Sequence, residues 1–352
     1  MNRQIALGMA AATLALPLLA VAADNATLTT ARAVFAPLPA SADNHATNKL
    51  NPAKVALGKQ LYFDARLSKG GTVSCNTCHN LATYGVDNLP TSMGHKGMFG
   101  GRNAPTVMNA ALLKPHFWDG RAKDAEEQAK GPIMNPVEMA IPHEGFAVER
   151  IASIPEYQAQ FQKAFPGEKA PLTYDNIANA IAAFERTLLT PSRFDAWLKG
   201  DAKAMSAQEV RGVKTFVEKG CVACHAGSTI GGDNFFKFGL VKGPYSDFTG
   251  VKNTDHGVYD LTKKDSDMDV FRTPTLRNVE RTYPYFHDGS VWELDKAVRI
   301  MGQTQLGIQL NDQEVADITA FLKSLTGTVP TAALQLPILP ASTAKTTKPD
   351  NM

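Results

Sequence analysis

Cysteine is scarce in this chain, with four residues in 352, and that scarcity excludes a small scaffold built on disulfides. Charge is low and balanced: the net charge is +2, and no run of five or more like charges occurs. Nothing in the charge pattern therefore points to a nucleic-acid partner. Strand-like alternation is also rare, whereas helical periodicity is frequent, so the chain is predicted to be mainly α-helical.

Long apolar runs are absent except at the N-terminus. Residues 1–23 contain one early positive charge, Arg3, then an apolar run, then small residues. Gly8, Thr13 and Pro17 interrupt this run, which is shorter than the about 20 residues that a spanning helix needs. A cleaved signal peptide explains the segment better than a retained membrane anchor does. The sequence thus predicts an exported protein, located in a bacterial periplasm, with no membrane span in its mature form.

All the cysteines belong to two copies of one pattern, Cys-x-x-Cys-His. The copies comprise Cys75, Cys78, His79, Cys221, Cys224 and His225. Two disulfides or a zinc site of four cysteines are the alternatives in an exported protein. Neither explains a histidine directly after each pair, and the pairs lie too far apart for a zinc ribbon. The pattern is the attachment motif of c-type haem, whose histidine binds the iron, so two covalently bound haem c groups are predicted.

Each haem motif follows a similar predicted helix. The helix before Cys75 contains Gly58 and Tyr62, and the helix before Cys221 contains Gly212 and Phe216 at the same spacing. In both helices the glycine would allow close approach of another backbone or of a haem face. The similarity predicts two haem domains of the c-type cytochrome kind, with long loops around the haems.

Other helices and the domain limits follow from periodicity and capping residues. Residues 173–189 and 310–325 each place apolar side chains on one face. We expect a signal peptide over 1–23, an N-terminal haem domain over 24–190 and a C-terminal haem domain over 191–330. Residues 331–352 are rich in Pro, Ala and Thr and are expected to form an extended or loose tail.

The second axial ligand of each iron decides whether a haem carries electrons or opens to a substrate. Candidates after the second motif are His256, Met268, His287 and Met301. Those in the first domain are Met93, His95, Met98, Met108, His116, Met134, Met139 and His143. Spacing alone does not choose among them, because most methionines fill hydrophobic cores.

Several motifs closely resemble those of the bacterial di-haem cytochrome c peroxidases. They include "GRNAPTVMNA", "FWDGR", "PVEM", "FRTPTLRNVERTYPYFHDGSV" and "RIMGQTQLG", and the resemblance extends from about Ala53 to Leu325. It implies reduction of hydrogen peroxide to water with electrons from a small exported cytochrome c or blue-copper protein. It also implies a bound calcium ion and a homodimer.

The resemblance further implies roles for individual residues. His95 matches the sixth ligand of the N-terminal haem in the resting oxidised enzyme, and the glycines around it would let that loop move. Met301 matches the methionine ligand of the C-terminal haem, which would give that haem a high potential. Glu138 matches the acid–base residue that moves protons between the peroxide oxygens, and Gln128 matches its polar neighbour.

The remaining roles concern the region between the haems. Trp118 matches a tryptophan that lies between the two groups. Asn103, Thr282 and Pro284 match positions that supply oxygen ligands to calcium, the last two through backbone carbonyls. Arg272 and His287 are expected to contact haem propionates.

Two alternative functions remain. One is the related group of maturation enzymes for methylamine utilisation, which oxidise residues of a partner protein and carry tyrosine at the position of Met301. The other is a di-haem electron carrier with two permanently six-coordinate irons, which would have no use for Glu138 or for a mobile His95 loop.

Overall fold

The computed structural model describes residues 26–43, 45–252 and 255–350, so the predicted signal peptide lies outside the described residues. The chain is mainly α-helical, as predicted. Its helices are α2 (Pro52–Phe63), α3 (Cys75–Cys78), α4 (Ala125–Met134), α5 (Glu144–Ala152), α6 (Pro155–Ala164), α7 (Tyr174–Glu185), α8 (Arg193–Leu198), α9 (Ala207–Glu218), α10 (Ser246–Thr249), α11 (Tyr259–Thr262), α12 (Leu294–Leu306), α13 (Asp312–Ser324) and α14 (Thr331–Leu334). Residues 26–34 are helical as well.

Short elements connect these helices. Strands β1 (Phe235–Lys237) and β2 (Val270–Arg272) form an antiparallel pair, with Phe236 opposite Phe271. Single 3-10 turns are η1 (Ala65–Leu67), η2 (Leu81–Thr83), η3 (His95–Gly97), η4 (Ala110–Leu112), η5 (Cys221–Ala223), η6 (Asp265–Asp267) and η7 (Val279–Arg281). Within the described ranges, no helix is both long and apolar enough to cross a membrane.

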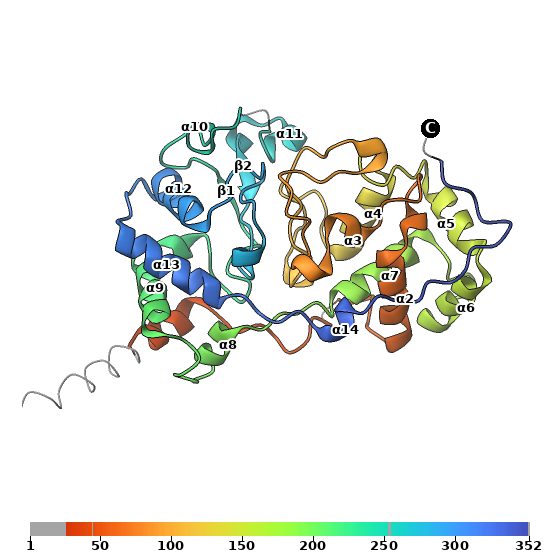
Figure 1. Ribbon diagram of the computed structural model, residues 1–352, viewed down its shortest axis with the longest axis horizontal. Coiled ribbons are helices and arrows are strands. Elements are labelled where there is room, and N and C mark those ends of the chain that lie inside the picture. The colour runs from red at the N-terminus through yellow and green to blue at the C-terminus, as the bar shows by residue number, and fades with distance from the viewer. Residues whose placement is uncertain (1–25, 44, 253–254, 351–352) are drawn as a thin grey trace, which may run out of the picture.

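The molecule has two bodies, each with its own hydrophobic core. In Figure 1, α2 and α4 to α7 form the body on the right, while α9, α12, α13 and the β1–β2 pair form the body on the left. The first core includes Leu61, Phe161 and Ile177, and the second includes Phe216 and Phe321. The haem motif that spans α3 belongs to the first body, and the motif that begins with η5 follows α9 of the second.

The same helix crossing occurs in both bodies. α2 packs on α7, and α9 packs on α13. A Cβ on Gly58 would overlap the carbonyl oxygen of Ala180, and a Cβ on Gly212 would overlap that of Asp317. Each glycine therefore lets another helix backbone approach, which is the first of the two expected uses, and the two haem motifs begin from equivalent helix pairs.

Capping residues define the starts of α9 and α13 and the end of α9. Ser206 accepts a hydrogen bond from the backbone N–H of Glu209, and Asn311 accepts one from that of Glu314, each in a reciprocal capping box. Gly220, with φ of 88°, ends the helix directly before Cys221.

Each described end of the chain packs against the body that is more distant from it in the sequence. Ala31 and Phe35 are buried in the second core, whereas Val329 and Ala333 are buried in the first. Because each end of the chain packs on the other body, the two bodies do not coincide with continuous segments of the sequence. The limits expected at 24–190 and 191–330 therefore remain a prediction.

The tail forms a strap over the first body (Figure 1). Arg66 donates to the carbonyl of Pro340 at 2.8 Å, and Ser153 Oγ lies 2.9 Å from Thr346 Oγ1. Near its end, Asp350 donates its backbone N–H to the carbonyl of Lys69 at 3.0 Å and pairs with the Lys69 ammonium at 3.2 Å. The strap thus ends beside Lys69, which lies a few residues before Cys75 in the sequence.

Replacing Gly212 with alanine is expected to destabilise the second body. The new methyl group has no room against the α13 backbone, and overpacking of this kind costs about 1–3 kcal/mol or more. Thermal unfolding of the holoprotein measures the loss. Gly101→Ala is the control, because nothing lies within 4 Å of its new Cβ. Equal melting temperatures for the two variants would contradict the close crossing of α9 and α13.

Candidate haem and catalytic site

A deep apolar cavity lies in the second body beside the second haem motif. Its lining includes Cys221, Cys224 and His225 of the motif and Met301 of α12. Of the four candidate ligands after this motif, only His287 and Met301 line the cavity. His287 Nε2 lies 3.1 Å from the hydroxyl of Tyr245, and His256 pairs with Asp269, so Met301 is the candidate best placed to face His225.

The imidazole of His225 is held in the form that binds a metal. Its Nδ1 lies 3.3 Å from the carbonyl oxygen of Ile230, and burial lowers its pKa to about 4. The ring is therefore neutral near pH 7 and can bind iron through Nε2. Gly231, at φ of 113°, lies against this ring, and a Cβ there would come within 3.0 Å of Nδ1.

Arg272 and His287, the two expected propionate contacts, both line this cavity. Arg272 is 4% exposed, and its guanidinium donates to the carbonyl oxygens of Phe117 and Gly232 at 3.0 and 3.3 Å. No carboxylate pairs with it in the described part of the chain. Burial lowers its pKa to about 10, so it stays cationic. The charge of Asp233 acts on the guanidinium without forming an ion pair with it. A buried cation with no ion pair among the described residues fits a group that brings its own carboxylates, as haem does with its propionates.

The first haem motif has the same local design. His79 follows the single turn of α3, its Nδ1 lies 3.3 Å from the carbonyl oxygen of Gly85, and burial lowers its pKa. The hydroxyl of Tyr62, from the preceding helix α2, donates to the backbone carbonyl of His79 at 2.5 Å. The imidazole is thus oriented from both sides of the motif.

The arrangement of the four thiols favours neither two disulfides nor a zinc site of four cysteines. None of the four cysteines forms a disulfide. Burial raises the pKa of every one of these thiols, to about 11 for Cys78 and Cys221, so they are protonated near pH 7. No group of side chains within the described residues brings the two cysteine pairs together around a metal.

His95 and Glu138 meet in one structural unit. The backbone N–H of His95 donates to the carbonyl oxygens of Val137 and Glu138, at 3.0 and 2.8 Å. Gly94 packs so closely on this backbone that a Cβ would overlap the carbonyl of Val137. The His95 side chain is buried, and Lys96 and Gly97 next to it have positive φ. The loop around His95 is therefore held by a few backbone contacts. Its turn has positive φ at Lys96 and Gly97, a conformation that is strained for a residue other than glycine.

The carboxyl group of Glu138 lies in a partly buried setting. Burial raises its pKa, while the positive charge of Arg121 and a 2.7 Å hydrogen bond from Asn135 act in the opposite direction. The charge of Glu138 in turn raises the pKa of the Cys78 thiol, so the carboxyl lies close to the first haem motif. Gln128 lies half-buried on α4, the helix that leads to Glu138. A carboxyl with a raised pKa beside a haem site is suited to proton transfer.

Trp118 lies in the second core, although it precedes the expected domain limit, and it lines the cavity. Its Nε1–H donates to the carbonyl of Asn103 at 2.9 Å, and its own carbonyl accepts from the Arg272 N–H at 2.7 Å. The ring meets that of His287 edge-on at 6.2 Å. The indole is thus fixed at the junction of the two bodies.

The three expected calcium ligands belong to the lining of the same cavity. Asn103, Thr282 and Pro284 all line the cavity. The backbone N–H of Asn103 donates to the carbonyl of His287 at 2.7 Å, while its side-chain N–H donates to that of Leu89 at 3.0 Å. The side-chain oxygen of Asn103 is left without a hydrogen-bond donor from the described residues, which suits a hard cation.

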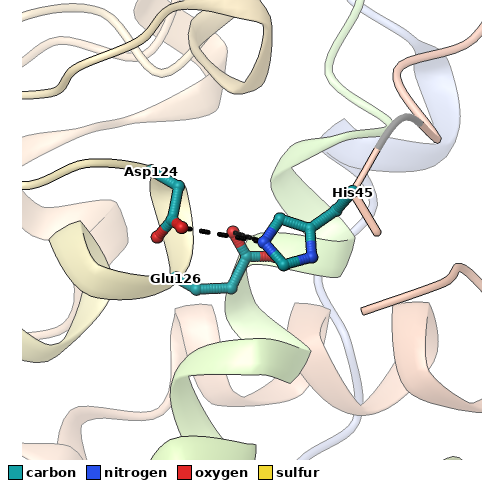
Figure 2. Close-up of side chains that lie close together, drawn as sticks. All are labelled: His45, Asp124 and Glu126. Atoms are coloured by element: carbon teal, nitrogen blue, oxygen red, sulfur yellow. Dashed lines mark ion pairs between the residues drawn. The ribbon is translucent and has the colours of Figure 1, made fainter. Parts of the chain in front are cut away.

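One other cluster could be mistaken for a metal site. Figure 2 shows the His45 ring directed at the carboxylates of Asp124 and Glu126, with Nε2 at 3.6 and 3.7 Å from them. His45 Nδ1 accepts the N–H of Asn48 at 3.0 Å, so the neutral ring carries its proton on Nε2 and has no free lone pair there. Glu126 pairs with the buried guanidinium of Arg186. The cluster therefore anchors the segment around residue 45 to the start of α4.

Sequence reasoning missed two residues near the sites. Glu185 on α7 is 6% exposed, burial raises its pKa to about 8, and its charge acts on Cys75. Its place on the apolar face of a predicted helix could have revealed it. Arg102 bridges Asp119 and Asp255, and no sequence pattern indicated those distant partners.

Several known proteins that resemble this chain are named cytochrome c peroxidases. The family model of the di-haem cytochrome c peroxidases matches residues 52–203, and that of cytochrome c matches residues 209–326. The chain is 50% identical over 320 residues to the cytochrome c551 peroxidase of Pseudomonas aeruginosa, covering 91% of each protein. It is 50% identical over 293 residues to that of Nitrosomonas europaea, covering 83% of this chain and 85% of that protein.

A solved structure extends the likeness to the fold. The MauG-like protein associated with microbial copper homeostasis has a TM-score of 0.73 and 28% identity, over 86% of this chain and 96% of that one. The relatives and the two haem motifs together identify an enzyme that binds two haem c groups and acts on hydrogen peroxide. The chain belongs to the bacterial di-haem cytochrome c peroxidase family.

Proposed function

We propose that peroxide is cleaved at the site of His79 and that electrons enter through the site of His225 and Met301. The observation that carries this assignment is the contact between the His95 loop and the Glu138 backbone next to the first haem motif. It joins a candidate ligand that must leave and a candidate acid–base group in one unit. The second body has Met301 in its cavity instead, which fits a permanently ligated haem.

When bound, the haem groups supply iron that accepts and donates electrons and, where a position is open, binds peroxide. Glu138 would take a proton from the near peroxide oxygen and return it to the departing one, with Gln128 as its polar neighbour. His95 would close the first site in the oxidised enzyme. Its loop can then open when the second site receives one electron.

Electron transfer would use the junction of the two bodies. Met301 as a thioether ligand would give the second haem a high potential, suited to accept electrons from a small cytochrome c or blue-copper protein. Trp118, fixed by Asn103 and Arg272, would lie on the route from the second site to the first. Arg272 and His287 would contact propionates at the second site.

Calcium, dimerisation and export complete the proposal. Asn103, Thr282 and Pro284 would hold a calcium ion at the junction, where it could link the geometry of the two bodies to the His95 loop. Met93, Met98 and Phe99 of that loop are exposed, and Phe99 is 62% exposed. Such an apolar surface would suit contact with a second copy of the chain. Residues 1–23 would direct export to the periplasm.

Met301→His tests the electron-entry site. The variant should keep a six-coordinate second haem but lower its potential, because imidazole favours ferrous iron less than a thioether does. Peroxide turnover with a high-potential donor should fall, whereas turnover with a strong artificial reductant should persist. Redox titration of the second haem measures the shift, with Met268→His as the control because Met268 does not line the cavity. An unchanged potential in Met301→His would assign the ligand elsewhere.

A further inference from the structure

Arg102 joins three segments that are distant in sequence. Its Nε and Nη2 donate to the two carboxylate oxygens of Asp255, at 2.6 and 2.8 Å, and its Nη1 donates to Asp119 at 2.6 Å. Both edges of the planar guanidinium are thus occupied, and its side chain is 20% exposed. The two carboxylates hold the pKa of Arg102 above its ordinary value, so it remains charged.

These ion pairs close a ring of contacts around Trp118. Asp119 directly follows Trp118, and the carbonyl of Asn103, directly after Arg102, accepts the indole N–H. The N–H of Asn103 donates to the carbonyl of His287. The Tyr245 hydroxyl closes the ring, at 3.1 Å from His287 Nε2 and 3.2 Å from the carbonyl of Asp255. The segments 102–103 and 118–119 are therefore paired twice, once by charge and once through the indole.

Asp119 also pairs with a second cation, Arg121. Loss of Arg102 would therefore not leave the buried Asp119 carboxylate unpaired. Arg121 donates to both oxygens of Asp119, at 3.0 and 2.8 Å, and its guanidinium stacks 3.5 Å from the ring of Phe117. Without Arg102, Asp119 would keep this local partner. What would be lost is the link from Asp119 to Asp255, which lies in the segment between α10 and α11 of the second body.

We propose that Arg102 is a positioning residue for electron transfer: its two-sided fork holds Trp118 at a fixed place between the two haem sites. The inference rests on the proposed electron route through Trp118. Electron-transfer rates fall steeply with separation, so a small displacement of the indole slows the reaction. Lysine cannot replace this arrangement, because its ammonium is a single point charge that does not bind two carboxylates in a planar fork.

The test is the rate of electron transfer between the haems in the holoenzyme. Enzyme that carries one electron on the second haem is mixed rapidly with peroxide, and the oxidation of the second haem is followed by its spectrum. Arg102→Lys is expected to slow this step on the order of 10- to 100-fold, the usual effect of misplacing a reacting group by about 1 Å. Raising the ionic strength should slow the variant further, because its remaining ion pair is more exposed to screening. The melting temperature and the spectra of both haems should stay the same.

Three further variants serve as the control, as a second way to break the fork and as a test of coupling to Trp118. Arg299→Gln removes an exposed ion pair of the second body, Arg299–Asp312 at 2.6 Å, and should not change the rate. Asp255→Asn breaks the same fork from the other side and should reproduce the slowing, also if Arg102→Lys does not fold. In a Trp118→Phe background, Arg102→Lys should have little additional effect. A wild-type inter-haem rate in Arg102→Lys or in Asp255→Asn overturns the inference, and so does full additivity with Trp118→Phe. Absence of peroxide turnover in the wild-type enzyme would instead contradict the proposed function.

Discussion

Glu138→Gln is expected to slow peroxide cleavage by roughly 10²- to 10⁴-fold, the usual contribution of a positioned general acid–base. Glutamine keeps the shape of the side chain and can still meet Asn135, but it cannot take a proton from peroxide. Both haem spectra should stay nearly unchanged, because the carboxyl lies beside the first motif and is not one of its proposed ligands. Single-turnover mixing of the activated enzyme with peroxide measures the step directly.

The pH profile gives an independent check of Glu138. The carboxylate form must accept the proton, and burial raises the pKa of this group. Cleavage by the wild-type enzyme should therefore decline on acidification at a pH above the range of an exposed glutamate, and this limb should vanish in Glu138→Gln. Glu149→Gln, which changes an exposed glutamate on α5, is the matched control. Wild-type turnover in Glu138→Gln would reduce the residue to a structural role.

His95→Gly is expected to give peroxide turnover without prior reduction. If the imidazole closes the first site in the oxidised enzyme, its removal leaves a position open, and the activating electron is no longer needed. The wild-type enzyme should be six-coordinate and slow when fully oxidised, and five-coordinate at the first haem and fast after one electron enters. Spectra and peroxide turnover at each reduction level measure both changes.

Lys96→Gly separates loss of the imidazole from loosening of the loop. Lys96 adopts φ of 56° next to His95, so glycine there relieves backbone strain and keeps the candidate ligand. This control should still require the activating electron. The gate would be located elsewhere if His95→Gly also required it, or if the oxidised wild type turned over at full rate.

Local features of this protein could be predicted because they depend on residues close in sequence. Cys75, Cys78 and His79 form one turn at the end of which the imidazole is placed, and the same holds for the second motif. The caps at Ser206 and Asn311 need only a partner three residues later. The apolar periodicity of α7 and α13 likewise predicted their buried faces.

The residues whose site roles come from the family resemblance are brought together only by the folded chain. The structure brings Met301, Trp118, Arg272, His287 and the three candidate calcium ligands to one cavity. It brings His95 and Glu138 together beside the other motif. Many of these neighbours, such as Trp118 and His287 or His95 and Glu138, are far apart along the chain, and no periodicity or spacing relates them.

Sequence by itself determined the two haem motifs, the helices that precede them and the mainly helical fold, because each rests on local hydrogen bonds or on a repeating apolar face. Tertiary structure alone decided that Gly58 and Gly212 admit a helix backbone and not a haem face. It also decided that the ends of the chain cross between the two bodies, and that Arg102 reaches both Asp119 and Asp255. Such contacts join segments whose separation along the chain carries no signal. They exist only once two hydrophobic cores have formed and have fixed the junction between them.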